Sequence, residues 1–350
     1  MTGARDKIRV LIVDDSAIVR SILSESLAAE PDLTVVGAAP DPYIARDKIL
    51  ALEPDVVTLD VDMPRMDGLT FLTKLMRFHP LPVIIISSLG QSSCHMAIEA
   101  LRLGAVEVLA KPSSPCSVGE LRTVLANKIR AAAAARLRCL PEDPPGPASA
   151  SAPAPVSGSF NPATIVAMGA STGGTEAIRK VLVGLPEDFP GILVVQHIPA
   201  GFSRAFAQSL NQLCRMEVKE ACDGDLVASG RVLIAPGDYH MLLRRSGTTP
   251  KVVVKGGPRV NYQRPSVDVL FSSVAEDCEA NAVGVLLTGM GSDGAQGLLR
   301  MKRSGAFTIA QDESTSVVFG MPREAARLGG VCQVLPLGQV RQAVLDAARP

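Results

Sequence analysis

A glycine-rich stretch at residues 169–174 carries the first side chain whose position suggests chemistry. It reads Gly-Ala-Ser-Thr-Gly-Gly, after the apolar residues 164–168 and before a helical pattern over 175–182. Glycine adopts the positive φ that a sharp strand-to-helix turn needs, which would expose Ser171 beside the N–H groups of a helix N-terminus. Two interpretations stay open: Ser171 is a nucleophile whose oxyanion those donors hold, or the turn merely binds an anion on the helix dipole.

A serine nucleophile needs a base and a group that orients the base. Two of the four histidines lie in the second half of the chain. His197 directly follows the buried apolar run 192–196, whereas His240 lies in a turn that enters a strand, where structural histidines are common. We therefore favour His197 as the base. Asp293, flanked by glycine at another strand-to-helix turn, is the best-placed acid. The order serine, histidine, aspartate differs from that of the α/β-hydrolases, so the elbow motif does not imply that fold.

The same aspartate lies in a motif that has a second interpretation. Residues 289–294, Gly-Met-Gly-Ser-Asp-Gly, match the dinucleotide-binding pattern, and Asp312 and Glu313 follow near the distance of a ribose-binding acid. Against a nucleotide, Asp293 places a carboxylate where the pyrophosphate would lie, and the unit comes late in its domain. A nucleotide-dependent oxidoreductase therefore stays an alternative function. A second alternative is a phosphorylation-dependent binding adaptor with an inactive hydrolase domain.

A second group of polar side chains lies in the first 130 residues. Five of them end or follow successive predicted strands: Asp14, Asp15, Asp60, Ser87 and Lys111. Because the carboxyl ends of parallel strands meet at one edge of a sheet, three carboxylates would converge there and repel one another without a cation. Carboxylate oxygens suit Mg²⁺, and the hydroxyl and the lysine would complete a site for a phosphoryl group. The alternative is that each aspartate only caps a helix or lies exposed to solvent in a loop.

Hydrophobic periodicity predicts an α/β fold with two doubly wound, mainly parallel sheets. The first half alternates strands at 8–13, 33–38, 56–60, 83–87 and 106–109 with helices at 17–29, 41–52, 68–78, 93–103 and 117–135. The second half has predicted strands at 164–168, 192–196, 283–287, 307–310 and around 331–332, and helices at 175–182, 200–213, 266–277 and 295–304. Between them lies an added β-rich section, with strands near 216–219, 231–235, 240–244 and 251–254.

Composition divides the chain into domains 1–130 and 161–350. The Pro-, Ala- and Ser-rich stretch 131–160 cannot bury apolar surface and is predicted to be a flexible linker. The 35 Lys and Arg residues balance 35 Asp and Glu, so no global field favours nucleic acid. No apolar run is long enough to insert into a membrane, and the chain does not start with a signal-peptide pattern. Seven scattered cysteines without a C-x-x-C pair indicate reduced thiols and a cytoplasmic protein.

The first domain resembles a response-regulator receiver over its whole length. The matching residues are Asp14-Asp15, residues 59–68, Ser87 and Lys111-Pro112. The resemblance implies that Asp60 accepts a phosphoryl group from a histidine kinase. It also implies that Asp14, Asp15 and Asp60 hold Mg²⁺, while Ser87 and Lys111 contact the phosphoryl oxygens. Receivers often carry an aromatic residue three positions before the lysine, where this chain has Val108.

Residues 164 to about 347 resemble the catalytic domain of the CheB family of chemotaxis protein-glutamate methylesterases. The motifs that carry the resemblance lie at 168–174, 196–203, 264–271 and 287–294, and the order receiver, linker, esterase matches that family along the whole chain. A histidine commonly precedes the Arg-Pro-Ser-Val-Asp run, where this chain has Gln263. The resemblance implies that Ser171 is the nucleophile, His197 the base and Asp293 its partner.

The implied activity is demethylation of glutamate γ-methyl esters, and deamidation of glutamine, on methyl-accepting chemotaxis receptors. We expect backbone donors near Thr172 and Met290 to hold the oxyanion, with no cofactor at the hydrolytic site. Because the receiver is tethered to an enzyme and not to a basic DNA-binding module, phosphorylation should change esterase activity. The expected route is a receiver surface that blocks the catalytic cleft until Asp60 is phosphorylated. We expect a monomer.

Overall fold

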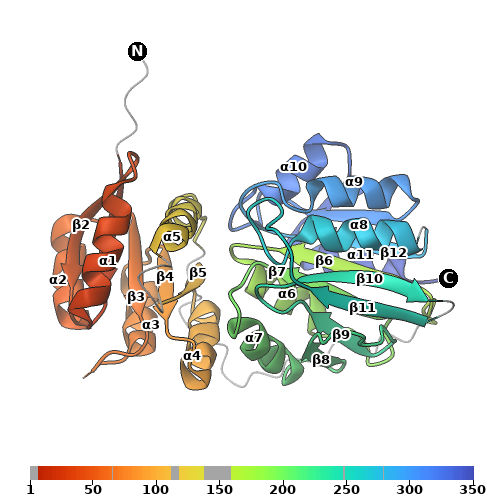
Figure 1. The fold of residues 1–350 in the computed structure, drawn as a ribbon, viewed down its shortest axis with the longest axis horizontal. Helices are drawn as coiled ribbons and strands as arrows, with labels where there is room; N and C mark the ends of the chain where they lie inside the picture. Colours follow the sequence, from red (N-terminus) through yellow and green to blue (C-terminus); the bar gives the residue numbers. More distant parts are fainter. Residues whose placement is uncertain (1–6, 65, 112–117, 138–158, 247–248, 279) are drawn as a thin grey trace, which may run out of the picture. The chain divides into compact units, whose positions relative to one another are not determined.

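The computed structural model describes residues 7–64, 66–111, 118–137, 159–246, 249–278 and 280–350. The chain divides into two compact units, Met1–Pro144 and Pro145–Pro350. Each unit is built on a parallel sheet with helices packed against it, which agrees with the predicted α/β class (Figure 1). Pro112 of the receiver-like motif and most of the predicted linker lie outside the described residues.

The first unit contains a five-stranded parallel sheet in the order β2-β1-β3-β4-β5. Its strands are β1 (Ile8–Val13), β2 (Leu33–Ala39), β3 (Val56–Asp60), β4 (Val83–Ser87) and β5 (Glu107–Ala110). Its helices are α1 (Ala17–Ala28), α2 (Pro42–Leu52), α3 (Gly68–Phe78), α4 (Gln91–Arg102) and α5 (Val118–Ala133). Every residue of β3 and β4 is buried because helices cover both faces of the sheet.

The helices that follow β1 and β3 both begin at side chains that cap them. Ser16 Oγ accepts a hydrogen bond at 3.4 Å from a backbone N–H in the first turn of α1, and Asp67 Oδ1 accepts one at 2.7 Å in the first turn of α3. The N-caps of these helices are therefore Ser16 and Asp67. Helix capping does not account for Asp14 and Asp60, which lie at the ends of β1 and β3.

The second unit contains a seven-stranded parallel sheet in the order β14-β13-β12-β6-β7-β9-β8. Its strands are β6 (Ile165–Ala170), β7 (Ile192–Gln196), β8 (Glu217–Glu220), β9 (Arg231–Ile234), β12 (Ala282–Leu286), β13 (Phe307–Gln311) and β14 (Gln333–Leu335). The β-rich section divides its strands between two sheets. β8 and β9 extend the main sheet, whereas β10 (His240–Ser246) and β11 (Thr249–Lys255) form a separate antiparallel pair.

The helices of the second unit are α6 (Gly174–Leu182), α7 (Phe202–Asn211), α8 (Val267–Cys278), α9 (Ala295–Arg303), α10 (Met321–Arg327) and α11 (Leu337–Ala347). Sequence analysis did not predict α10 or α11, and it placed the last strand near 331–332, two residues before β14 begins. α10 has only seven residues, which is too short for a clear helical period. Among the described residues, no helix has both the length and the apolar character to cross a lipid bilayer.

The order of the strands defines where a ligand would bind in the second unit. From β6 the chain proceeds to β7 on one side, and it later returns to β12 on the other side and continues outward to β13 and β14. This reversal is a topological switch point, and ligands of open α/β sheets bind at the carboxyl ends of the strands beside it. The loops that follow β12, β6 and β7 therefore share one edge of the sheet.

Helix α8 packs between the β10–β11 pair and α9, and it contacts β6 (Figure 1). Its inward side chains Leu270, Phe271 and Val274 are fully buried in the hydrophobic core. A close contact holds its first turn against β6, because a Cβ on Gly169 would lie only 2.2 Å from Val267 Cγ1. Glycine at this position brings the N-terminus of α8 to the carboxyl end of β6.

Candidate active site

Ser171 follows β6 directly and is buried, with 7% of its surface exposed. Its backbone is held on two sides. Its N–H donates to Thr288 O at 2.9 Å, and its carbonyl accepts from Gly174 N at 2.7 Å and from Gln196 Nε2 at 2.9 Å. Gly173 has φ +75°, the positive value that the sequence predicted for this turn. The serine therefore lies in a rigid strand-to-helix turn at the switch point of the sheet.

His197 follows β7, and its backbone N–H donates to Ala170 O at 3.2 Å, next to Ser171. Its ring Nε2 lies 2.8 Å from Asp293 Oδ2, and both side chains are buried. The other ring nitrogen, Nδ1, is buried and has no hydrogen-bond partner among the described residues. The structure thus brings the predicted base and acid together and leaves Nδ1 of the imidazole available to a further partner.

Asp293 follows β12 and is 2% exposed. Besides His197, its carboxylate accepts hydrogen bonds from two side chains, Ser266 Oγ at 2.7 Å and Asn261 Nδ2 at 3.0 Å. Burial alone would raise the pKa of Asp293. The imidazole of His197 and the hydrogen bonds from Asn261 and Ser266 outweigh burial and lower that pKa. Asp293 is therefore a stably ionised carboxylate in a buried place.

The N-terminus of α8 supplies further donors to the same carboxylate. Val267 N donates to Asp293 Oδ2 at 2.7 Å, and Asp268 N donates to Oδ1 at 3.2 Å. Free N–H groups and the helix dipole both favour an anion at this position. Sequence analysis assigned no role to the run from Ser266 to Asp268. The available signal was a serine at the start of a predicted helix, which is the usual N-cap residue.

His240, the alternative base, occupies a different place. Its Nε2 lies 3.0 Å from Pro258 O, and its Nδ1 accepts a hydrogen bond from Ser266 N at 3.2 Å. Both nitrogens are thus committed to backbone groups of the segment that leads into α8. His240 is a buried structural histidine that holds Ser266, which in turn contacts Asp293.

The two residues predicted to donate to an oxyanion lie on the loops after β6 and β12. Thr172 is buried, and its carbonyl accepts from Thr288 Oγ1 at 3.0 Å. Met290 is 42% exposed. The backbone between the loops is close, because a Cβ on Gly289 would lie 2.7 Å from Ser171 Cβ. The loop that carries Met290 therefore passes directly beside Ser171.

The dinucleotide interpretation of residues 289–294 is not supported. The carboxylate of Asp293 occupies the turn and faces protein donors, so the turn presents negative charge where a pyrophosphate would bind. Asp312, one of the two acids proposed to bind a ribose, accepts instead from Thr315 N at 3.0 Å in a local turn. The motif also follows β12 rather than the first strand of its sheet.

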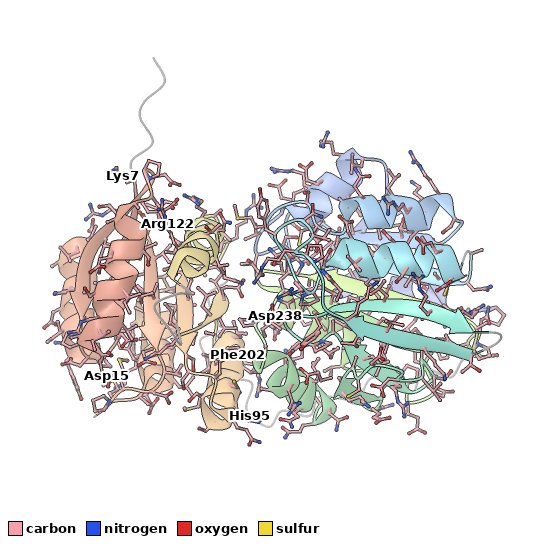
Figure 2. The ribbon with its side chains drawn as sticks, viewed as in Figure 1. Lys7, Asp15, His95, Arg122, Phe202 and Asp238 are labelled. Carbon is pink, nitrogen blue, oxygen red and sulfur yellow. The ribbon has the colours of Figure 1, made fainter. Side chains whose placement is uncertain are left out.

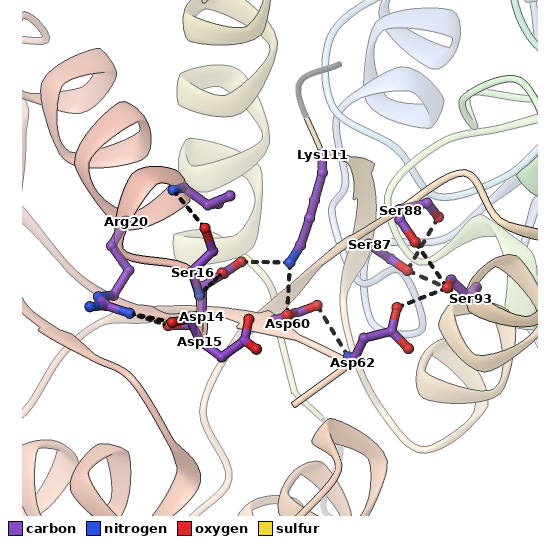
Figure 3. A network of polar contacts seen from close by, with 11 residues as sticks. Asp14, Asp15, Ser16, Arg20, Asp60, Asp62, Ser87, Ser88, Ser93 and Lys111 are labelled. Atoms are coloured by element: carbon purple, nitrogen blue, oxygen red, sulfur yellow. Dashed lines mark hydrogen bonds and ion pairs between the residues drawn. The ribbon is translucent and has the colours of Figure 1, made fainter. Parts of the chain in front are cut away.

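The five polar residues of the first unit lie at the carboxyl ends of its strands (Figure 3). Lys111 Nζ lies 2.7 Å from Asp60 Oδ2 and 3.0 Å from Asp14 Oδ2. Asp14, Asp15 and Asp60 each offer a carboxylate oxygen within 4.8 Å of the others; the first and last are buried, whereas Asp15 is exposed (Figure 2). Three oxygen ligands at this separation, open to solvent on one side, fit a hydrated Mg²⁺ ion.

Charge in this cluster is crowded. Burial raises the pKa of Asp14, and the negative charge of Asp60 raises it further, despite the hydrogen bond from Lys111. Burial would lower the pKa of Lys111, but hydrogen bonds to the two aspartates outweigh burial and raise it. Two buried carboxylates thus share one lysine, so a cation added here would relieve repulsion.

Ser87 and Val108 lie near this cluster without joining its ion pairs. Ser87 Oγ donates to Ser93 O in the first turn of α4 at 3.3 Å, and Ser93 Oγ donates to Asp62 Oδ2 at 2.8 Å (Figure 3). Val108 is fully buried in β5. The hydroxyl that was expected to contact a phosphoryl oxygen is bound to α4 in this structure.

Comparison with known proteins assigns both units to families. A family model described as CheB methylesterase matches residues 166–344, and one described as response regulator receiver domain matches residues 10–123. A protein-glutamate methylesterase/protein-glutamine glutaminase of Syntrophus aciditrophicus is 54% identical over 340 residues, which cover 97% of this chain and 98% of that protein. A relative of the same name from Rhodospirillum rubrum is 52% identical, covering 97% and 98% of the two chains.

A solved structure agrees with the second assignment. The crystal structure of the Thermotoga maritima CheB methylesterase catalytic domain covers 55% of this chain and 99% of its own, with 38% identity and a TM-score of 0.51. The sheet and the loops described above are thus those of a methylesterase domain, and a receiver domain precedes it. The chain belongs to the CheB methylesterase family of response regulators.

Proposed function

We propose that this protein is a serine hydrolase that removes methyl groups from glutamate γ-methyl esters on the cytoplasmic helices of methyl-accepting chemotaxis receptors. The observation that carries the proposal is the convergence of the loops that hold Ser171, His197 and Asp293 at the ends of three neighbouring strands, with His197 Nε2 2.8 Å from Asp293 Oδ2. The names of its relatives support glutamate methyl esters and glutamine amides of proteins as the substrate class, and the resemblance of the sequence motifs implies chemotaxis receptors. The free cysteines among the described residues fit a reducing cytoplasm.

In the proposed reaction, His197 Nδ1 takes the proton of Ser171 as Oγ attacks the ester carbonyl. Nδ1 is the available nitrogen because Nε2 faces Asp293. The ester C–O bond then breaks, and His197 returns the proton to the leaving methoxide, which departs as methanol. Water attacks the acyl-enzyme with His197 again as the base. A receptor carboxylate and free Ser171 result.

Two features of the site stabilise the charges that form during this reaction. Asp293 holds the imidazole and stabilises imidazolium. We place the oxyanion between the backbone N–H groups of Thr172 and Met290, whose loops flank Ser171, each donor contributing about 3 kcal/mol. The same steps on a glutamine amide would release ammonia, which accounts for the second activity in the relatives' names.

Methanol release from methylated receptor membranes tests the proposal. The variant Ser171→Ala should lose activity by about 10³-fold or more. Ser304→Ala is the matched control, because Ser304 lies at the end of α9, bonds only locally to Met301 O, and should keep full activity. Near-normal methanol release from Ser171→Ala would contradict the assignment of the nucleophile.

We further propose that Asp60 is the phosphoryl acceptor and that a histidine kinase is the donor. Asp14, Asp15 and Asp60 would hold Mg²⁺, which supplies positive charge to the transferring phosphoryl group. Lys111, already 2.7 Å from Asp60, would pair with a phosphoryl oxygen, and Ser87 would donate to another after leaving Ser93. Incorporation of phosphate from acetyl phosphate should require Mg²⁺ and should disappear in Asp60→Asn. If Asp60→Asn incorporated as much phosphate as the unchanged protein, the acceptor would be another residue.

A further inference from the structure

Asn261 lies in a tight turn beside the candidate active site. Val260 N donates to Gln263 O at 3.0 Å and Gln263 N donates to Val260 O at 2.8 Å, so residues 261 and 262 form a two-residue turn. Asn261 and Tyr262 have φ of 50° and 63°, a region that asparagine tolerates better than most residues. Tyr262 is 81% exposed, whereas the side chain of Asn261 reaches Asp293.

The amide of Asn261 bridges two carboxylates. Its Nδ2 lies 3.0 Å from Asp293 Oδ1 and 2.7 Å from Asp268 Oδ2. An amide nitrogen carries two N–H groups, and here each of them faces one carboxylate. The opposite orientation of the amide would place its oxygen against two anions. The contacts therefore fix both the position and the orientation of the Asn261 side chain.

The two carboxylates need such a bridge because they repel each other. Burial raises the pKa of Asp268, and the charge of Asp293 raises it further. Asp268 is itself anchored, since its Oδ1 accepts from Gly297 N at 2.6 Å. A neutral donor between the two holds Asp293 in place and leaves its negative charge for His197. A lysine or arginine at this point would neutralise that charge.

We propose that Asn261 is a positioning residue of the esterase, which orients the Asp293 carboxylate toward His197 without neutralising it. This inference rests on the proposed function, and it adds a group that acts only through Asp293. Asn261 is distinct from Ser266, which contacts the same oxygen but also caps α8, since Val269 N donates to Ser266 Oγ at 3.4 Å. Asn261 contacts α8 only through the side chain of Asp268, and unlike Ser266 it does not cap that helix.

The surroundings of Asn261 allow a clean substitution. Arg264 anchors the segment independently, donating through Nη1 to Gly257 O at 2.6 Å and through Nη2 to Asp238 Oδ1 at 2.8 Å. Asn261 and Asp268 also line a cavity of about 410 Å³, whose other walls include Leu242 and Val269. A changed side chain at 261 faces this space and does not overpack the core.

The test compares Asn261→Ala and Asn261→Asp in the full chain, with methanol release measured against pH. In Asn261→Ala, kcat should fall by about 10- to 100-fold while KM changes less than about 2-fold, because the hydrogen bonds to Asp293 and Asp268 are lost but no proposed substrate contact is. The acid limb of kcat/KM should move to higher pH in both variants. In both variants Asp293 has one fewer hydrogen-bond donor, so its negative charge stabilises the imidazolium form of His197 more strongly. In Asn261→Asp the new carboxylate adds to this stabilisation.

Asn211→Ala is the matched control, since Asn211 Oδ1 accepts from Val218 N outside this network. It should lower thermal stability without moving the acid limb. If the acid limb of kcat/KM does not move in either Asn261 variant, the inference is overturned and Asn261 is a structural residue, whether or not kcat falls. Ser171→Ala, measured in parallel, separates the two hypotheses: near-normal methanol release from that variant contradicts the proposed function, whatever Asn261 does.

Discussion

At the scale of single residues, the site depends on how one buried carboxylate keeps its charge. Asp293 has protein donors on both oxygens, and the first turn of α8 adds its dipole. Because these contacts fix the carboxylate, Asp293 in turn orients the ring of His197. The ring presents Nε2 to Asp293, the reverse of the arrangement in which Nδ1 faces the aspartate.

The two histidines of the second unit predict different losses on substitution. His197→Ala should reduce methanol release by about 10³-fold or more, because the proposed base is gone. His240→Ala should reduce it far less, since His240 only holds Ser266 N and Pro258 O, but it should lower the melting temperature. Activity and thermal melts of both variants provide the check. If His240→Ala lost as much activity as His197→Ala while the two variants melted at similar temperatures, His240 would have a part in the reaction as well.

Asp293 also predicts a pH dependence of stability. Its pKa is lower in the folded protein than in the unfolded chain. Its contribution is therefore complete above the ordinary carboxyl pKa of about 4 and is lost as pH falls through the lower folded value. Asp293→Asn should destabilise the esterase domain by about 2 kcal/mol at pH 7 and by progressively less below about pH 4. Urea unfolding at several pH values measures the difference.

Asp346→Asn is the control for that series, because Asp346 is half exposed and pairs only with its own helix and the C-terminal residues. Its effect on unfolding should be within about 0.5 kcal/mol at every pH. A penalty for Asp293→Asn that stayed constant down to pH 3 would mean that the carboxylate is not the stabilising form.

At the scale of elements, the approach of α8 to β6 is what brings donors to Asp293. Gly169→Ala would drive a methyl group into Val267, whose N–H donates to Asp293. We expect the esterase domain to lose about 2 kcal/mol of stability from overpacking. Methanol release should also fall by about 10-fold, because α8 must shift. Gly338→Ala is the matched control: nothing lies within 4 Å of that Cβ, and α11 should tolerate it. Full activity in Gly169→Ala would show that the contact is not needed.

The elements themselves were largely predictable from the sequence. Strands such as β3 and β4 are short apolar runs buried on both faces, and α3 has a clear apolar stripe between Asp67 and His79, so local pattern alone defines them. Helices α10 and α11 were not predicted. β8 and β9 were predicted as strands, but their place in the main sheet depends on long-range pairing that periodicity does not encode.

The candidate site divides in the same way. Ser171, His197 and Asp293 follow apolar strands, so sequence alone places them at strand ends. Asn261 and Ser266 precede a helix in a segment without strong pattern, and they reach Asp293 only because the β10–β11 pair and α8 fold back over β6. The sequence marks Ser266 only as a helix N-cap and does not mark Asn261 at all, because contacts of this kind arise from tertiary packing.

At the scale of the whole molecule, a receiver domain and a methylesterase domain share one chain. Domain limits of 1–130 and 161–350 stay a proposal, because residues 138–158 lie outside the described residues. Helix α5 continues to Ala133, so the proposed linker begins as helix. Arg130 of α5 holds Asp32 and Glu30 near the start of β2 and lowers the pKa of both carboxyls, which ties this helix to the receiver sheet.

The tether itself predicts that phosphorylation controls the esterase. If the receiver blocks the catalytic cleft until Asp60 is phosphorylated, removing the receiver should have the same effect as phosphorylating it. Residues 160–350 alone should release methanol about 10-fold faster than the unphosphorylated full chain, a typical coupling between two sites. Acetyl phosphate with Mg²⁺ should raise the rate of methanol release by the full chain toward that of the fragment. It should not change the rate of Asp60→Asn or of the fragment.

The fragment and the Asp60→Asn variant separate the possible routes of control. Phosphorylation adds negative charge at the edge where Lys111 and Ser87 lie, and Ser87 now bonds to the first turn of α4. A fragment no more active than the unphosphorylated full chain would exclude simple occlusion. If acetyl phosphate still activated the full chain in that case, the receiver would have to act as a positive effector. Phosphorylation would then create an activating contact and would not merely remove an inhibitory one.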